Sequence, residues 1–147
     1  MCGIFGQISR EKFSSQDVLR SLKRLEYRGY DSFGIASDSG LFDTHVGEIK
    51  IPSDGNDCSI AISHTRWATH GKVSEANAHP HHDCTKNIFI VHNGIIENYE
   101  EIKENLLALG HKFCSETDSE IIAHYFEEGM KLQTMEETIQ NFFAEAK

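Results

Sequence analysis

The second residue of the chain is a cysteine whose position suggests chemistry. Loss of Met1 would leave Cys2 with a thiol and a free α-amino group on one residue. An unperturbed thiol, with a pKa of about 8.5, needs a base to become a nucleophilic thiolate near neutral pH. An α-amino group, with a pKa of roughly 7.7 to 8.0, suits that task. Cys2 is therefore a candidate N-terminal nucleophile, while its ordinary interpretation is a small buried residue that begins a strand.

A second candidate group follows an apolar segment at residues 88–91. Asn93 and Gly94 form an Asn-Gly pair, which commonly makes a tight turn. The functional alternative is an oxyanion hole, in which the Asn93 side-chain NH₂ and the Gly94 backbone N–H converge on a developing oxygen anion. Glycine permits this close approach because it lacks a Cβ atom.

Two charged side chains could complement the two ends of an amino acid. Arg66 follows an apolar strand, and its planar fork fits a carboxylate. Asp118 could pair with an ammonium group. The ordinary alternatives are a surface arginine packed on Trp67 and a carboxylate favoured near a helix N-terminus. Together with the cysteine and the Asn-Gly pair, the two charges match the carboxylate, ammonium and side-chain carbonyl of one amino-acid ligand.

Short strands and later helices must position these groups. Short apolar segments, weakly alternating at residues 4–9 and continuous at 88–91, predict strands at residues 4–9, 33–37, 41–46, 60–63 and 88–91. Residues 65–86 have no sustained period and predict a long irregular loop, a type of segment that often carries function. Strands followed by helices predict an α+β fold with antiparallel pairing.

Capping residues predict where the helices begin. Ser14 is a predicted N-cap for a helix that contains residues 18–25 and ends at Gly29. A further helix covers residues 102–109. Capping boxes formed by Thr117 with Glu120, and by Thr134 with Glu137, predict the last two helices.

Composition narrows the class of protein. The 147 residues carry a formal net charge of -9, whereas a nucleic-acid binder needs a basic face. We therefore expect no nucleic-acid partner. The sequence shows no membrane span or signal pattern, so we expect no membrane partner and a cytoplasmic location.

A histidine-rich segment raises the question of a metal. Clustered His and Cys side chains can bind zinc, and the candidates are His79, His81, His82 and Cys84. Their spacing matches no closed tetrahedral pattern. We therefore predict a polar loop, no metal site and no cofactor.

Six blocks of sequence resemble one known family, the class II glutamine amidotransferases of the N-terminal nucleophile type. They lie, in order, at residues 1–6, 25–32, 64–71, 77–81, 91–98 and 116–120. Within the family, five residues resemble the branch that acts on sugar phosphates: Tyr27, Tyr30, Trp67, Thr69 and His70. The resemblance implies a four-layer αββα sandwich of antiparallel sheets, here incomplete at the C-terminus.

The resemblance also implies roles for individual residues. Cys2 resembles a nucleophile that forms a γ-glutamyl thioester from L-glutamine and so releases glutamate and ammonia. Asn93 and Gly94 resemble the oxyanion hole. Residues implied to bind or enclose the substrate are Arg28, Arg66, Trp67, Thr69, His70, His79 and Asp118.

The resemblance implies only the glutaminase part of an enzyme of amino-sugar synthesis. We expect residues 1–147 to be a C-terminally truncated type-2 amidotransferase domain without the sugar isomerase domain. A separate chain could supply that domain, and homo-oligomerisation stays open. The alternative is a non-catalytic remnant or interaction module that keeps the motifs.

Overall fold

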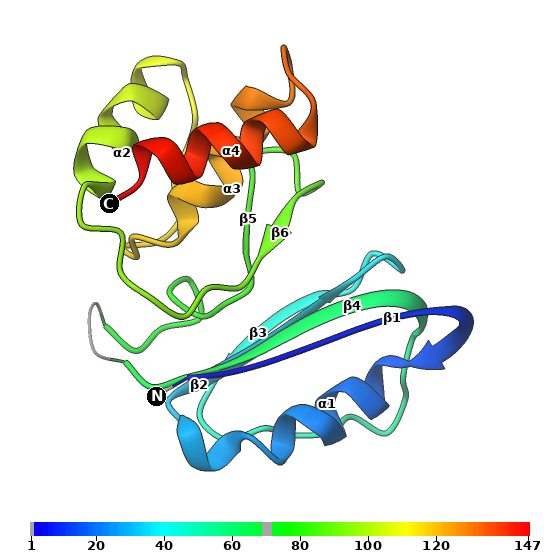
Figure 1. Ribbon diagram of the computed structural model, residues 1–147. Coiled ribbons are helices and arrows are strands. Elements are labelled where there is room, and N and C mark those ends of the chain that lie inside the picture. The colour runs from blue at the N-terminus through cyan, green and yellow to red at the C-terminus, as the bar shows by residue number, and fades with distance from the viewer. Residues whose placement is uncertain (1, 69–71) are drawn as a thin grey trace. The chain divides into compact units, whose positions relative to one another are not determined.

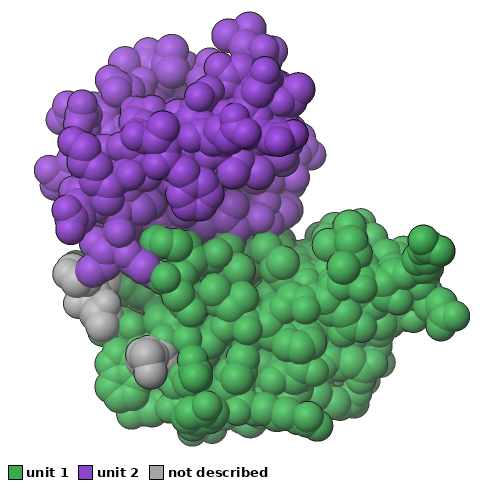
Figure 2. All heavy atoms as spheres, in the orientation of Figure 1, with its two compact units in different colours: residues 1–80, 91–93 green, residues 81–90, 94–147 purple. Residues whose placement is uncertain are grey.

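A computed structural model of the chain, which describes residues 2–68 and 72–147, places its strands in two antiparallel sheets (Figure 1). With four α-helices in the described residues, this confirms the predicted α+β class. The chain divides into two compact units, coloured separately in Figure 2. The first unit contains residues 1–80 and 91–93, and the second contains residues 81–90 and 94–147. Among the helices described, none is long and apolar enough to cross a membrane.

The sheet of the first unit has the strand order β1-β4-β2-β3. Its strands are β1 (Gly3–Ser14), β2 (Ser32–Ser37), β3 (Phe42–Val46) and β4 (Asp57–Arg66). The predicted strands are confirmed, but β1 and β4 extend further because they pair with each other from Gly3↔Thr65 onward. On the other side of β4, Ser32 pairs with Arg66. The start of β1 and the end of β4 therefore meet at one end of the sheet.

Helix α1 (Ser15–Lys23) covers one face of this sheet (Figure 1). The predicted N-cap is confirmed, because the Ser14 side chain accepts a hydrogen bond from the Gln16 N–H at 3.3 Å. Val18, Leu19 and Leu22 are buried in the core. Full burial of each such side chain is worth about 1.5–3 kcal/mol, so packing more than propensity holds this short helix.

The predicted end of this helix at Gly29 is wrong. Helix α1 ends at Lys23, and a 3₁₀ turn, η1 (Glu26–Arg28), follows it. Gly29 serves a packing purpose instead, since a Cβ atom there would lie 2.7 Å from the Arg66 carbonyl carbon and from the Trp67 nitrogen. The chain needs glycine where it passes this closely behind the end of β4.

The second unit combines a two-stranded sheet with three helices. The elements are β5 (His81–His82), β6 (Phe89–Ile90), α2 (Tyr99–Ala108), α3 (Glu120–Gly129) and α4 (Met135–Glu145). Its apolar core contains Ile102, Leu106, Ile121 and Phe142. The predicted loop at residues 65–86 is confirmed for residues 67, 68, 72–80 and 83–86, but residues 65 and 66 complete β4, and 81 and 82 form β5.

One of the two predicted capping boxes is wrong. Helix α3 begins after Ser119 with no side-chain cap. The Thr117 hydroxyl instead makes a hydrogen bond of 2.7 Å with His81 Nε2. The Glu120 carboxylate accepts hydrogen bonds from the Cys114 and Ser115 N–H groups, each at 2.7 Å. Tertiary partners have replaced the local cap.

The second capping box is confirmed and can be tested. Thr134 accepts from the Glu137 N–H, and the Glu137 carboxylate accepts from the Thr134 N–H. We expect Thr134→Ala to lower the free energy of unfolding by about 1 kcal/mol, because it removes the side-chain acceptor at the start of α4. Urea unfolding measures the change. Thr134→Ser keeps the hydroxyl and is the matched control; an equal loss in both variants would contradict a capping role.

Candidate functional site

Cys2 lies where the first residues of the chain meet the end of β4. The Gly3 N–H donates to Thr65 Oγ1 at 3.1 Å, and the Trp67 N–H donates to Cys2 Sγ at 3.3 Å. A Cβ atom on Gly3 would lie 2.8 Å from Leu25 Cβ and 2.9 Å from Thr65 Oγ1, so this approach also requires glycine. The sulfur also lies 3.8 Å from the Trp67 carbonyl oxygen, so both polar groups of Trp67's main chain face the Cys2 side chain.

Asn93 contacts the main chain of the same cysteine. Its Nδ2 donates to the Cys2 carbonyl oxygen at 3.2 Å. Its Oδ1 lies 2.9 Å from His64 Nε2. An amide NH₂ has two hydrogens, so one remains for a second acceptor beside Cys2.

His64 determines which way the Asn93 amide points. The imidazole is fully buried. Burial lowers its pKa to about 4, although the hydrogen bond with Asn93 acts in the opposite direction. A neutral ring at pH 7 satisfies Asn93 Oδ1 by donating from Nε2, and this assignment follows from the hydrogen-bond network. The contact with Asn93 gives His64 a positioning role.

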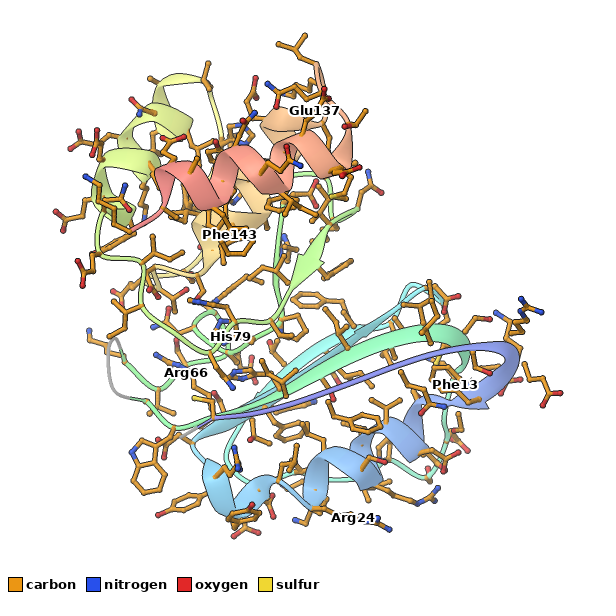
Figure 3. All side chains as sticks on the ribbon, viewed as in Figure 1. Phe13, Arg24, Arg66, His79, Glu137 and Phe143 are labelled. Carbon is orange, nitrogen blue, oxygen red and sulfur yellow. The ribbon has the colours of Figure 1, made fainter. Side chains whose placement is uncertain are left out.

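Arg66 is held at the end of β4 and is buried (Figure 3). Its Nη1 donates to the Lys72 carbonyl oxygen at 3.4 Å, and Asn77 Nδ2 donates to the same oxygen at 3.0 Å. Asp31 fixes the main chain here. Its N–H donates to the Arg66 carbonyl oxygen at 3.1 Å, and its carboxylate accepts from the Ala68 N–H at 2.8 Å.

Three other predicted residues also belong to the first unit. Trp67 is exposed and makes an edge contact with Tyr30, with ring centroids 5.4 Å apart. His79, labelled in Figure 3, is buried with its ring centroid 4.3 Å from that of His64. Arg28 lies in η1, with its guanidinium 5.8 Å from the centroid of the Tyr27 ring.

The remaining predicted residues are distributed differently. Gly94 and Asp118 belong to the second unit, where the Asp118 carboxylate accepts from the Ile96 N–H at 2.8 Å. Asp118 therefore fixes the segment that follows Gly94. Thr69 and His70 lie outside the described residues.

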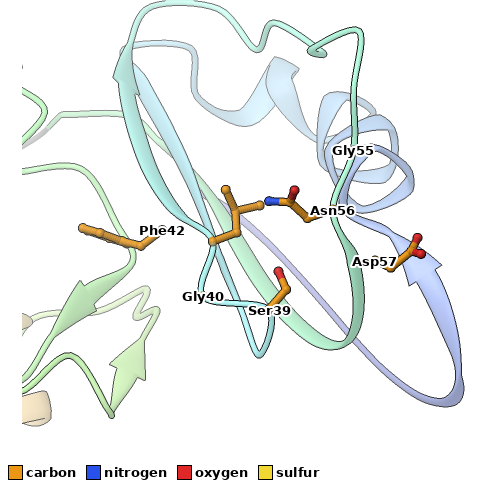
Figure 4. A pocket seen from close by; sticks show the side chains of 7 residues that line it. Ser39, Gly40, Phe42, Gly55, Asn56 and Asp57 are labelled. Carbon is orange, nitrogen blue, oxygen red and sulfur yellow. The ribbon is translucent and has the colours of Figure 1, made fainter.

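A hollow in the first unit lies at the start of β4, whereas Cys2 contacts Trp67 just after the end of that strand. Figure 4 shows the side chains that line the hollow. The hollow is lined by residues 39–42 and 55–57. Its side chains include no cysteine, histidine or basic residue. This hollow therefore lacks the thiol, imidazole and guanidinium that the Cys2 region combines.

Comparisons with known proteins agree on the class of domain. The profile of a family described as "Glutamine amidotransferase domain" matches residues 53–144, more than half of the chain. The chain is 51% identical over 138 residues to a glutamine–fructose-6-phosphate aminotransferase [isomerizing] of Methanococcus maripaludis, covering 89% of this chain and 23% of that protein. It is 51% identical over 136 residues to the Thermotoga maritima protein of the same name, covering 87% and 22%.

A solved structure shows the same fold. Glutamine phosphoribosylpyrophosphate amidotransferase from B. subtilis matches with a TM-score of 0.76 and 25% identity, over 100% of this chain and 33% of that one. The chain spans under a quarter of the length of the two aminotransferases.

The buried state of His64 has a measurable consequence. Its folded-state pKa of about 4 lies below the ordinary 6.5, so the folded protein binds fewer protons than the unfolded chain between these values. The contribution of the neutral His64 ring to the free energy of unfolding is complete above pH 6.5. It is lost as the pH falls toward 4, which lowers the free energy of unfolding by roughly 3 kcal/mol at most. We expect an NMR titration to place the His64 imidazole near pH 4.

A His64 titration near pH 6.5 would contradict the neutral, donating ring.

Proposed function

The chain belongs to the glutamine amidotransferase family, and on this premise we propose that it hydrolyses the side-chain amide of L-glutamine with Cys2 as the nucleophile. The observation that carries the proposal is the pair of hydrogen bonds around Cys2: the Trp67 N–H donates to its sulfur, and the Asn93 amide donates to its carbonyl oxygen. Removal of Met1 is a requirement, because the Cys2 α-amine is the proposed base.

In the first half of the reaction, the α-amine takes the thiol proton and the sulfur attacks Cδ of glutamine. The C–S bond forms as the carbonyl oxygen becomes an anion. One Asn93 Nδ2 hydrogen and the Gly94 N–H are the proposed donors to that oxygen, and donors placed where charge develops lower the barrier. The intermediate collapses with cleavage of the C–N bond. The ammonium of Cys2 returns its proton to the departing nitrogen, which leaves as ammonia.

In the second half, water attacks the γ-glutamyl thioester. The α-amine accepts a proton from the water, the C–S bond breaks, and glutamate leaves with the regenerated thiol. The same base serves both halves because it is attached to the residue that carries the sulfur.

Charge complementarity assigns the other end of glutamine. Arg66 is the proposed partner of the α-carboxylate, since its guanidinium is always charged and matches a carboxylate fork. Asp118 is the proposed partner of the α-ammonium. His79, Thr69 and His70 are proposed to enclose the substrate. Trp67 is proposed to lie where ammonia leaves the site, and Arg28 is proposed to lie at the edge of the substrate site.

The fate of the ammonia follows from the names of the relatives. Those proteins are aminotransferases of fructose 6-phosphate. Because the matched residues form under a quarter of each relative, we assign amination of the sugar phosphate to a part of such an enzyme outside these 147 residues.

Replacement of Cys2 tests the nucleophile. We expect Cys2→Ala to abolish release of ammonia from glutamine, by at least about 1,000-fold, because no other group forms the thioester. Cys58→Ala should retain the activity, since Cys58 is buried in the core beneath α1. Intact mass should show loss of one methionine and one adduct on Cys2 after treatment with a glutamine-like electrophile. Retained Met1 in active protein, or an adduct on another cysteine, would exclude the scheme.

Replacement of Asn93 tests the oxyanion donor separately. We expect Asn93→Ala to lower kcat about 100- to 1,000-fold with little change in KM, because the donor acts mainly on charge that develops in the transition state. Asn105→Ala, at an exposed position of α2, is the matched control. A rise in KM at constant kcat would instead show that Asn93 binds the ground state.

A further inference from the structure

A cluster of four metal-ligating side chains lies within the second unit, and none of its members has a role in the proposed hydrolysis. The cluster consists of Cys84, His111, His124 and Glu127. One ligand atom from each lies within 4.8 Å of the others. We propose that these four side chains bind a zinc ion that fastens the second unit together.

The distances match the edges of a zinc tetrahedron. Zinc bonds of about 2.3 Å to sulfur and about 2.0–2.2 Å to nitrogen or oxygen place S···N pairs about 3.5 Å apart and N···O pairs about 3.3 Å apart. Cys84 Sγ lies 3.7 Å from His111 Nδ1 and 3.5 Å from His124 Nδ1. Glu127 Oε2 lies 3.1 Å and 3.5 Å from the same two nitrogens. Four edges of the tetrahedron are therefore already at the required length.

Both histidines turn the same nitrogen inward and have a carboxylate on the other side. His111 Nε2 lies 3.0 Å from Glu128 Oε2. His124 Nε2 lies 3.6 Å from Glu120 Oε1, which is within ion-pair reach although longer than a hydrogen bond. A carboxylate behind a histidine keeps its proton on the outer nitrogen and leaves the inner one as a ligand, the usual arrangement around zinc.

The set of donor atoms selects the metal. One thiolate sulfur, two imidazole nitrogens and one carboxylate oxygen suit zinc, whereas magnesium and calcium prefer oxygen alone. Four protein ligands complete the tetrahedron and leave no position for substrate, which is typical of a structural site. His111 and His124 are buried and Cys84 is exposed, so an ion could enter from the side of the cysteine.

The cluster places a thiol and a carboxylate beside the same two imidazoles. A divalent ion bound among them would stabilise the charged forms of the thiol and the carboxylate together.

The site would connect segments that are distant in sequence. Cys84 follows β5, His111 follows α2, and His124 and Glu127 lie one turn apart on α3. Zinc would thereby hold the turn between β5 and β6 and the end of α2 against α3. A hydrogen-bonded cluster of protonated histidines sharing Glu127 is the competing explanation of these contacts.

Cobalt(II) in place of zinc distinguishes the two explanations. The full chain, treated with a chelator and then titrated with Co(II), should bind one equivalent with the absorption of a tetrahedral ion and a thiolate-to-cobalt charge-transfer band. Zinc should displace the cobalt. Cys84→Ser should remove the charge-transfer band and weaken zinc binding by more than the roughly 100-fold typical of losing an outer partner.

Two cysteine variants are matched controls. Cys114→Ser, in the same unit and exposed, and Cys2→Ala should both keep the complete spectrum. A band that persists in Cys84→Ser, that disappears in Cys2→Ala, or that never forms in the unaltered chain overturns the proposal. If Cys84→Ser does not fold, an increase in Tm on adding zinc to Cys2→Ala, reversed by chelator, supports the site, and an unchanged Tm contradicts it.

Discussion

The antiparallel pairing of β1 with β4 is the constraint on which the candidate site depends. Because Gly3 pairs with Thr65, the residue before β1 lies beside the residues that follow β4. Side chains alternate between the two faces of a sheet, so a slip of one residue would transfer every core residue of β1 to the opposite face. Packing of α1 against the sheet opposes such a slip. The apolar core thereby fixes the position of a polar, reactive residue that has little packing of its own.

The buried contact between His64 and Asn93 orients a side chain beside Cys2 that the strand register alone does not position. Burying His64 removes an imidazole from water, a cost that only hydrogen bonding offsets. Its contact with Asn93 satisfies one of the two ring nitrogens, Nε2, and also fixes the amide, so one interaction serves both stability and orientation. Gly29 and Asp31 support the same region from behind, one by its lack of a side chain and the other by two hydrogen bonds. The groups around Cys2 are therefore held by neighbours that take no part in the chemistry.

Local patterns predicted local features, and failed where distant partners compete. The strands of the first unit, the Ser14 cap and the Thr134 capping box depend on neighbouring residues and were confirmed. Thr117 has the same local pattern as Thr134, yet its hydroxyl is bonded to His81, 36 residues away. The pair of His64 with Asn93 spans 29 residues, and no periodicity carries that information. Likewise, the cysteine in the histidine-rich segment has its ligand-like neighbours at residues 111, 124 and 127, not at 79, 81 and 82.

The two units meet the demand for stability in different ways. In the first, α1 and the sheet bury a continuous set of aliphatic and aromatic side chains. In the second, fewer apolar residues are buried, and the buried residues include Glu120, His111 and His124, as those of the first include His64, Arg66 and His79. Buried ionisable groups stabilise a fold only when each finds a partner, and small cores commonly rely on an additional cross-link. The Glu120 carboxylate has such partners in His124 and in the Cys114 and Ser115 N–H groups. Burial alone would raise the pKa of Glu120, but these partners outweigh it and lower the pKa to about 2. The inner nitrogens of the two histidines share a single carboxylate oxygen and one sulfur. Without a cation these atoms compete for the same hydrogen bonds, whereas a bound cation would make all of them its ligands.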